Sequence, residues 1–314
     1  MLNDAQVVQF RTDGYVVVED VLPAPVLDAV RAEYGDLMDG LYAGWQASGR
    51  VPDGTGLDFW GKLAASYAAG CDWFQPMDIS LPGGEIAPDT PMHFGPAIFD
   101  LVTHPRLLDL AEALIGPDLT LNPIQHVRIK PPSPQLRADE TRAHITRTDW
   151  HQDRAVGLEE ADQTDMVTVW VAITDATVEN GCLQVVPGID AGMLPHCPQV
   201  QTAIAPRHLD TSRAVPLPVR AGGVVLFHPL APHASLPNLS DRFRWSFDLR
   251  FSKTGQNTGR EHFPGFIVRS RNAPEQELRD WTVWRDGWFD ARDRLARTPH
   301  IPIHRWASDA PYCA

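Results

Sequence analysis

Short runs of β-branched and aromatic residues recur between residues 119 and 252 and are separated by turn residues. The runs are LTLNPIQHVRIK, DMVTVWVAITDA, CLQVVPG, AVPLPV, GVVLFHP, HASLPN and RWSFDLRF. Strands at this spacing, with no helical segment between them, favour an antiparallel sandwich or barrel over an alternating α/β fold. The sequence therefore predicts a mainly β core over about residues 119–252.

Helical patterns precede this core. Residues 4–12 predict a short helix, GYVVVEDVLP predicts a strand, and APVLDAVRAEYGDLMDGLY predicts a helix with one apolar face. Residues 45–95 are rich in Gly, Pro and Trp and have no clear period, so we expect a long covering segment there. PRLLDLAEALIGPD predicts a helix that Gly116 and Pro117 end.

The residues after the core predict a loop and one helix. The stretch EQELRDWTVWRDGWFDARDRLAR has helical periodicity, and we expect its tryptophans to pack against the core. No internal repeat or low-complexity tract divides the chain, so residues 1–314 are expected to form one domain. Within it, a helical and covering segment, 1–118, precedes the β core, and a loop and helix, 253–314, follow it.

Composition excludes several classes of protein. The net charge of −13 argues against nucleic-acid binding, which depends on Lys and Arg. No run approaches the roughly 18 apolar residues of a membrane span, and the first residues lack a signal-peptide pattern, so we expect a cytoplasmic protein. The four cysteines show no CxxC spacing, which indicates neither a zinc cluster nor a disulfide framework and favours a reducing compartment.

The stretch RTDWHQDRAVG contains two residues that can bind a metal, His151 and Asp153. Residues i and i+2 of a strand point to the same face, so the two side chains converge if residues 149–153 are extended. A His-x-Asp pair alone is weak evidence and needs a third ligand. The candidate is His233, after the strand GGVVLFHP; His228 is a rival that we expect to be structural.

The residues after His233 distinguish iron from zinc. Two histidines and one carboxylate with open positions are typical of non-haem Fe(II) oxygenases, although zinc hydrolases use similar ligands. Arg244 follows eleven residues after His233 and can bind both oxygens of a carboxylate, as 2-oxoglutarate requires. Fe(II), one Asp and dianionic 2-oxoglutarate together carry one negative charge, which Arg244 would neutralise. Arg242 and Arg250 lie close enough to leave this assignment open.

These segments together resemble the phytanoyl-CoA dioxygenase family of Fe(II)- and 2-oxoglutarate-dependent oxygenases. The resemblance rests on WHQD, VWVAITDATVENGCLQVVPG, GGVVLFHPLAPHAS, and HASLPNLSDRFR with its arginine eleven residues after the histidine. DGYVVVEDVLP and RIKPPSP are also similar to family segments. The resemblance implies a double-stranded β-helix, or jelly roll, with flanking helices.

The resemblance also implies the roles of individual residues. The Fe(II) ligands would be His151, Asp153 and His233. Arg244 would anchor 2-oxoglutarate with help from Ser235, and Trp170 and His126 (or the neighbouring Gln125) would line the co-substrate pocket. The family often continues PGSH where this chain has PGID, which concerns the substrate side of the site.

The leading hypothesis is a dioxygenase that uses Fe(II), 2-oxoglutarate and O2 to hydroxylate or otherwise oxidise an unactivated C–H bond of a small molecule. Because related halogenases replace the carboxylate at this position, Asp153 favours oxidation over halogenation. The substrate would be a secondary metabolite or an acyl or carboxylate compound, and Arg128 or Arg154 could contact an anionic one. The alternatives are a metal-dependent hydrolase or isomerase and a catalytically silent jelly-roll binding module.

Overall fold

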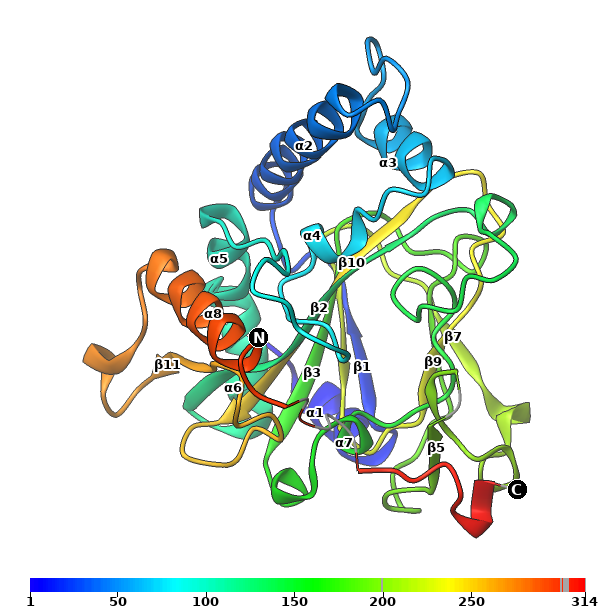
Figure 1. Ribbon diagram of the computed structural model, residues 1–314. Coiled ribbons are helices and arrows are strands. Elements are labelled where there is room, and N and C mark those ends of the chain that lie inside the picture. The colour runs from blue at the N-terminus through cyan, green and yellow to red at the C-terminus, as the bar shows by residue number, and fades with distance from the viewer. Residues whose placement is uncertain (199, 300, 302–304, 314) are drawn as a thin grey trace.

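Two antiparallel sheets face each other across the middle of the molecule (Figure 1). The computed structural model describes residues 1–198, 200–299, 301 and 305–313. The larger sheet has the strand order β1-β8-β3-β10-β2-β11, and the smaller has the order β7-β4-β9. This arrangement, with helices outside the larger sheet, is the jelly roll that the sequence predicts.

The strands are short except for two that run through the centre of the larger sheet. Their bounds are β1 (Tyr15–Val18), β2 (Asp118–Lys130), β3 (Met166–Ala172), β4 (Leu183–Val185), β5 (His196–Pro198), β6 (Thr202–Ile204), β7 (Val215–Leu217), β8 (Val224–Phe227), β9 (His233–Ser235), β10 (Arg244–Lys253) and β11 (Phe266–Ser270). The helices are α1 (Asp4–Thr12), α2 (Ala24–Ala47), α3 (Phe59–Ala68), α4 (Phe74–Met77), α5 (Pro96–Val102), α6 (Pro105–Ile115), α7 (Asp153–Val156) and α8 (Trp281–Leu295).

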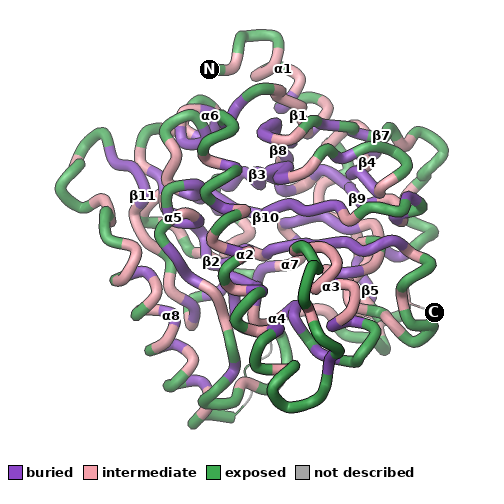
Figure 2. The backbone as a smooth tube through the Cα atoms, turned by 90° about the horizontal axis from the view of Figure 1, so that it is seen from above, coloured by how far each residue is buried: buried purple, intermediate pink, exposed green. Residues whose placement is uncertain are grey.

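Alternation along β10 separates an apolar face from a polar one. The odd-numbered residues from Trp245 to Phe251 join the large apolar core beneath the helices. The even-numbered residues from Arg244 to Arg250 are polar or charged, yet they are buried as well. Since successive side chains of a strand point to opposite faces, these polar groups line the space between the two sheets. Figure 2 shows β3 as a continuously buried strand, and β10 is buried up to its last residue.

The helices cover the outer face of the larger sheet, as Figure 1 shows for α2, α5, α6 and α8. Tyr34 of α2 lies edge-to-face against Trp245 of β10, with ring centroids 5.1 Å apart. Trp284 and Trp288 of α8 are buried against Phe94, which confirms the expected packing role of these two tryptophans. No helix within the described ranges is long and apolar enough to cross a membrane.

Several sequence predictions need correction. Residues 45–95 are not wholly irregular, because they contain α3 and α4. The stretch after residue 252 contains β11, which pairs with β2 at the edge of the larger sheet. The last helix begins at Trp281, with only a 3-10 turn at Pro274–Gln276 before it. The larger sheet therefore extends beyond residues 119–252 at both edges, through β1 and β11.

The expectation that the sequence holds no disulfide is wrong. Cys197 and Cys313 form a disulfide that joins β5 to the C-terminal tail. The tail also stacks Trp306 on His196, with ring centroids 5.1 Å apart, and the Trp306 indole donates to the carbonyl of Ala155 at 2.9 Å. The two cysteines lie 116 residues apart and follow no recognised spacing pattern, so their pairing could not be predicted from the sequence. The other two cysteines are free and buried.

Candidate functional site

His151 and His233 face each other on an antiparallel bridge beside the smaller sheet. Their backbones exchange two hydrogen bonds of 2.9 Å, and their ring centroids lie 4.2 Å apart. The Nδ1 of His151 lies 2.9 Å from the carbonyl of Asp149, and the Nδ1 of His233 lies 3.0 Å from that of Ala231. A carbonyl only accepts, so each Nδ1 carries the hydrogen and each Nε2 offers a lone pair.

Asp153 places its carboxylate against both of these Nε2 atoms. Oδ1 lies 3.8 Å from the Nε2 of His151, and Oδ2 lies 3.8 Å from the Nε2 of His233. The segment is not fully extended as we expected, because Asp153 is the first residue of the short helix α7. The three side chains nevertheless bring one ligand atom each to within 4.8 Å of one another, and all three are buried.

The chemistry of this donor set fits a ferrous ion. Two neutral imidazoles and one carboxylate, with space left beside them, are the ligands of non-haem Fe(II) oxygenases. Burial, and then the neighbouring His233, lower the pKa of His151 to about 3, so its imidazole is neutral near pH 7. Burial raises the pKa of Asp153, but Arg250 and the two histidines outweigh it and hold that pKa well below its ordinary value. His151 and Asp153 are therefore in the protonation states that a cation requires.

Two further residues fix the carboxylate of Asp153. The hydroxyl of Thr168 on β3 donates to Oδ2 at 2.6 Å, and the guanidinium of Arg250 on β10 contacts Oδ1. Arg250 is also held by the carbonyl of Ile124 at 3.0 Å. Partners of this kind orient a metal ligand and tune its basicity. The sequence analysis named Arg250 only as an alternative to Arg244. In the sheet, Arg244 pairs with Lys130 and Arg250 pairs with Asn122, and only Arg250 contacts Asp153.

Arg244 lies deep in a small cavity that His151 and His233 also line. It is 1% exposed, its Nη1 donates to the hydroxyl of Ser246 at 3.2 Å, and its guanidinium lies over the ring of Trp170 at 5.1 Å. Its Nε is buried and has no hydrogen-bond partner among the described residues. Burial, and then the nearby Arg128, lower the pKa of Arg244 to about 9. This cation is thus positioned to receive an anion in the cavity.

Ser235 lies in the same cavity and has a partner that sequence reasoning missed. The Nζ of Lys130 donates to the hydroxyl oxygen of Ser235 and to the carbonyl of Leu236, both at 2.7 Å. The backbone N–H of Thr148 donates to the same hydroxyl oxygen at 2.8 Å. With both lone pairs occupied, the Ser235 hydroxyl is left to donate its own hydrogen. Burial, and then Arg244, lower the pKa of Lys130 well below its ordinary value.

The structure does not bring His126 into this group. Its Nδ1 lies 2.9 Å from Asp78, and it lines a neighbouring cavity with His144 instead of the cavity that contains Arg244. His228 also lies outside the group, as expected, and packs against Phe10 with ring centroids 5.7 Å apart. The structure thus gathers the three predicted ligands with Arg244, Ser235 and Trp170, and leaves His126 at a different surface.

The missed residues follow a pattern that the sequence does contain. In RWSFDLRF, apolar residues alternate with Arg244, Ser246, Asp248 and Arg250, and in QHVRIK they alternate with His126, Arg128 and Lys130. Strands at the centre of a sheet are usually apolar on a face that is turned to the core. A strand that places charged residues on its inner face therefore marks the wall of a polar site.

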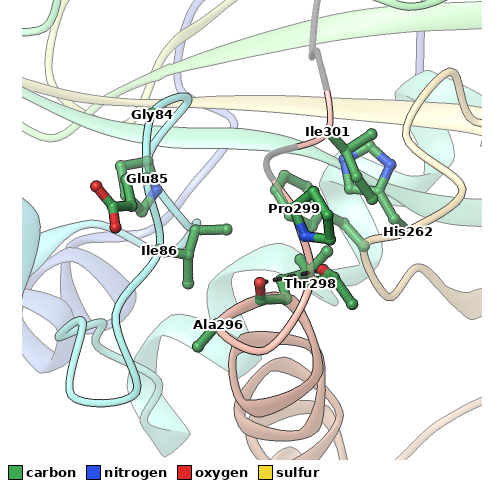
Figure 3. Close-up of a pocket in the computed structure, with 11 residues that line it drawn as sticks. Gly84, Glu85, Ile86, His262, Ala296, Thr298, Pro299 and Ile301 are labelled. Carbon is green, nitrogen blue, oxygen red and sulfur yellow. Dashed lines mark hydrogen bonds between the residues drawn. The ribbon is translucent and has the colours of Figure 1, made fainter.

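A separate cavity of about 310 Å³ lies between residues 82–86, the end of α8 and His262 (Figure 3). Ile86 lies on one side of it, and Thr298 and Pro299 lie on the other. None of the predicted site residues lines this cavity, so its position gives it no role in the chemistry of the metal ligands.

The jelly roll and its buried His-Asp-His group define the class of non-haem iron enzymes. The family model described as phytanoyl-CoA dioxygenase (PhyH) matches residues 10–246. The chain belongs to the phytanoyl-CoA dioxygenase family. This family uses 2-oxoglutarate and O2, and the donor set described above fits its Fe(II).

Curated relatives agree with this membership. Phytanoyl-CoA dioxygenase domain-containing protein 1 of Danio rerio is 26% identical over 288 residues, which are 82% of this chain and 92% of the relative. The protein of the same name from Rattus norvegicus is 36% identical over 88 residues, which are 25% of this chain and 30% of the relative. The peroxisomal phytanoyl-CoA dioxygenase of Bos taurus is 29% identical over 49% of this chain and 46% of its own length.

Solved structures share the fold at low sequence identity. The non-heme monooxygenase ThoJ, in its apo form, aligns with a TM-score of 0.57 and 23% identity over 93% of this chain and 97% of its own. EvdO2 from Micromonospora carbonacea var. aurantiaca, complexed with 2-oxoglutarate, aligns with a TM-score of 0.52 and 20% identity over 89% of this chain and 98% of its own. These similarities establish the common jelly roll.

Proposed function

We propose that this protein is a dioxygenase that uses Fe(II) and 2-oxoglutarate to hydroxylate, or otherwise oxidise, an unactivated C–H bond of a small molecule. The observation that supports this proposal is that His151 and His233, which form one buried group with Asp153, line the same cavity as the buried Arg244. A metal site alone would fit several reactions. A metal site with a buried, incompletely paired arginine fits a dicarboxylate co-substrate.

Different residues would bind the metal ion and orient its carboxylate ligand. His151, Asp153 and His233 would hold Fe(II), and Thr168 and Arg250 would keep the carboxylate of Asp153 in place. Bound Fe(II) with 2-oxoglutarate would supply the oxidation: 2-oxoglutarate and O2 would be converted to succinate and CO2, with one oxygen atom of O2 entering succinate and the other inserted into the C–H bond. The protein then has to position both molecules and keep bulk water out of the cavity.

Arg244 would bind the carboxylate of 2-oxoglutarate that lies away from the metal. A guanidinium can donate two parallel hydrogen bonds to one carboxylate, and such charge-assisted bonds are strong when buried. The Ser235 hydroxyl can add a third bond, because Lys130 and the Thr148 amide already occupy its lone pairs. Trp170 holds the guanidinium over its ring and so limits the directions in which Arg244 can point.

The walls of the cavity also support a dry site. Phe227 stacks on the ring of His233, with centroids 4.3 Å apart and planes 13° from parallel. Leu183 and Trp170 line the same cavity. Apolar residues beside the charged groups strengthen the electrostatic interactions within the cavity, because they lower the local dielectric constant. The partner this function implies is a small molecule; a cytoplasmic location stays a prediction.

The decisive experiment follows succinate. The protein is loaded anaerobically with Fe(II) and 2-oxoglutarate, O2 is admitted, and succinate is quantified over time. Slow succinate release without added substrate is expected, since such enzymes also turn over the co-substrate uncoupled. A hydrolase, an isomerase or a silent binding module would release none, and that result would refute the proposal.

Substitutions test whether succinate release depends on the metal ligands. Asp153→Ala and His233→Ala are expected to abolish succinate release, because each removes a metal ligand. His208→Ala is the matched control, since this histidine is exposed and lies outside both the metal group and its cavity. Succinate release that persists in Asp153→Ala at the wild-type rate would contradict the assignment of ligands.

A further inference from the structure

Arg128 of β2 has a guanidinium that is only half engaged. Its Nε and Nη2 both donate to the same oxygen of Asp248, Oδ2, at 3.0 and 2.8 Å. Its Nη1 is buried and has no hydrogen-bond partner among the described residues. The residue is 9% exposed. A buried N–H group without a partner costs free energy, so an arginine kept in this state indicates a ligand that completes it.

Arg128 lines the metal cavity, and its neighbour on the same strand face lines another. Arg128 lines the metal cavity together with His151 and Trp170. Two residues earlier on the same face of β2, His126 lines a second cavity of about 570 Å³. This volume is within the range of pockets that hold small molecules. An anion bound to Nη1 would therefore lie in the metal cavity, on the strand face that also carries His126.

The second cavity has walls that suit an organic molecule. His144 stacks on Phe74, with centroids 4.7 Å apart, and its ring lies 4.6 Å from that of His126. Burial, and then His126 and Arg128, lower the pKa of His144 well below its ordinary value, so its ring is neutral. The flat rings of His144 and Phe74 therefore provide apolar contact in this cavity.

The net charge around the metal ligands favours binding of a second anion. Four basic side chains and two carboxylates line the metal cavity or are hydrogen-bonded to its lining: Arg128, Lys130, Arg244, Arg250, Asp153 and Asp248. Fe(II) and dianionic 2-oxoglutarate cancel each other in charge. An excess of two positive charges remains, or of one if the strongly desolvated Lys130 is neutral. Buried cations in excess favour an anionic ligand.

Arg244 and Arg128 lie toward different ends of the metal cavity. Along β10, Arg244 pairs with Lys130 at the end that holds Ser235, where the carboxylate of 2-oxoglutarate has its donors. Arg128 pairs with Ser246, but Asp248 draws its guanidinium toward the next pair, which contains His126. The guanidinium is therefore displaced from the co-substrate end toward the strand pair that contains His126.

We propose that Arg128 binds a carboxylate of the organic substrate, whose carbon skeleton occupies the cavity lined by His126, His144 and Phe74. Asp248 acts as the positioning residue that orients the guanidinium. This inference rests on the proposed function and adds to it the class of substrate: a carboxylate small enough for this cavity. The interaction sets which molecule is held beside the metal ligands.

The experiment uses 4-fluorobenzoate as the probe and its fluorine resonance as the readout. The protein is loaded anaerobically with Fe(II) and saturating 2-oxoglutarate, and the probe is titrated. Broadening of the fluorine line beyond that seen with Zn(II)-loaded protein shows binding near the paramagnetic ion. Wild type is expected to bind 4-fluorobenzoate at least tenfold more tightly than the neutral 4-fluorobenzamide.

Substitution of Arg128 then tests the anchor. Arg128→Gln is expected to raise the dissociation constant of 4-fluorobenzoate at least tenfold and to change that of 2-oxoglutarate less than threefold. The double variant Arg128→Gln with Asp248→Asn removes both charges of the pair, so it tests the same loss if the single variant folds poorly. Arg11→Gln, on the exposed face of α1, is the control with the same change of net charge and wild-type affinity.

Three results would overturn the inference: no binding of 4-fluorobenzoate to wild type, equal affinity for the acid and the amide, or an affinity that Arg128→Gln leaves unchanged. Competition between 4-fluorobenzoate and 2-oxoglutarate would also overturn it, because the two would then share Arg244. Failure of the proposed function is recognised separately, by wild-type protein that neither binds 2-oxoglutarate nor releases succinate.

Discussion

The contact between Arg250 and Asp153 predicts how metal binding and stability are linked. Both side chains are almost completely inaccessible, at 2% and 0% exposure, and Arg250 is the cation that contacts the Asp153 carboxylate. The substitution Arg250→Met keeps the length of the side chain but removes the cation. In the metal-free protein, the variant leaves the carboxylate of Asp153 buried with only the hydroxyl of Thr168 as a close partner.

The magnitude follows from the burial of the pair. Breaking a buried ion pair by removing one partner costs about 3–5 kcal/mol, because the remaining charge is not compensated. We therefore expect metal-free Arg250→Met to lose about that much free energy of unfolding, with a melting temperature at least about 5 °C lower. A divalent ion restores a positive charge beside the carboxylate, so saturating Mn(II) is expected to close at least half of this gap.

The assay is urea unfolding of wild type and variant, with a chelator and then with Mn(II). Arg279→Met is the matched control, since Arg279 forms an exposed ion pair with Glu277, and such surface pairs contribute about 0–1 kcal/mol. Equal stability of metal-free Arg250→Met and wild type would refute the reasoning. So would a gap that Mn(II) leaves unchanged, because the ion would then not replace the missing charge.

Three further predictions use other parts of the molecule. Arg244→Leu is expected to weaken 2-oxoglutarate binding about 100-fold, the equivalent of about 3 kcal/mol of charge-assisted hydrogen bonds, and calorimetric titration that finds wild-type affinity would exclude its role. Burial lowers the pKa of His196 to about 4, so below the unfolded value of about 6.5 only the unfolded state takes up a proton, and stability falls as the pH drops through this window. Urea unfolding at pH 7 and pH 5 is expected to show a loss about 2 kcal/mol smaller in His196→Asn than in wild type. Replacing Cys197 and Cys313 by serine is expected to lower the free energy of unfolding by about 2–4 kcal/mol, and equal stability of this variant and the oxidised wild type would contradict a native bridge.

The ligand group could be predicted from sequence because its chemistry is partly local. His151 and Asp153 are separated by one residue. His233 is the first residue of β9, and Arg244 is the first residue of the next strand, β10. The short apolar runs likewise predicted an antiparallel sandwich or barrel, since each run reports its own periodicity, and the family resemblance specified the jelly roll. That the whole chain forms one domain stays a prediction.

What the sequence did not reveal depends on contacts between distant residues. Arg250 contacts Asp153 across 97 residues, and the disulfide spans 116. His126 shares its strand face with Arg128 and Lys130, but the segment that contains Asp78 covers it and draws it into another cavity. No local pattern encodes such a partner. The position of β11 was missed for the same reason, because five residues in a loop-rich stretch pair with β2 only in the folded sheet.

The pairing of β1 with β8 has a consequence for synthesis on the ribosome. Tyr15 of β1 pairs with Phe227 of β8. More than two hundred residues must therefore be translated after Tyr15 before this edge of the larger sheet can form. Until then the apolar run YVVV has no strand beside it, and nascent chains are exposed to association through it. Late closure of this edge is therefore a consequence of the order of the strands.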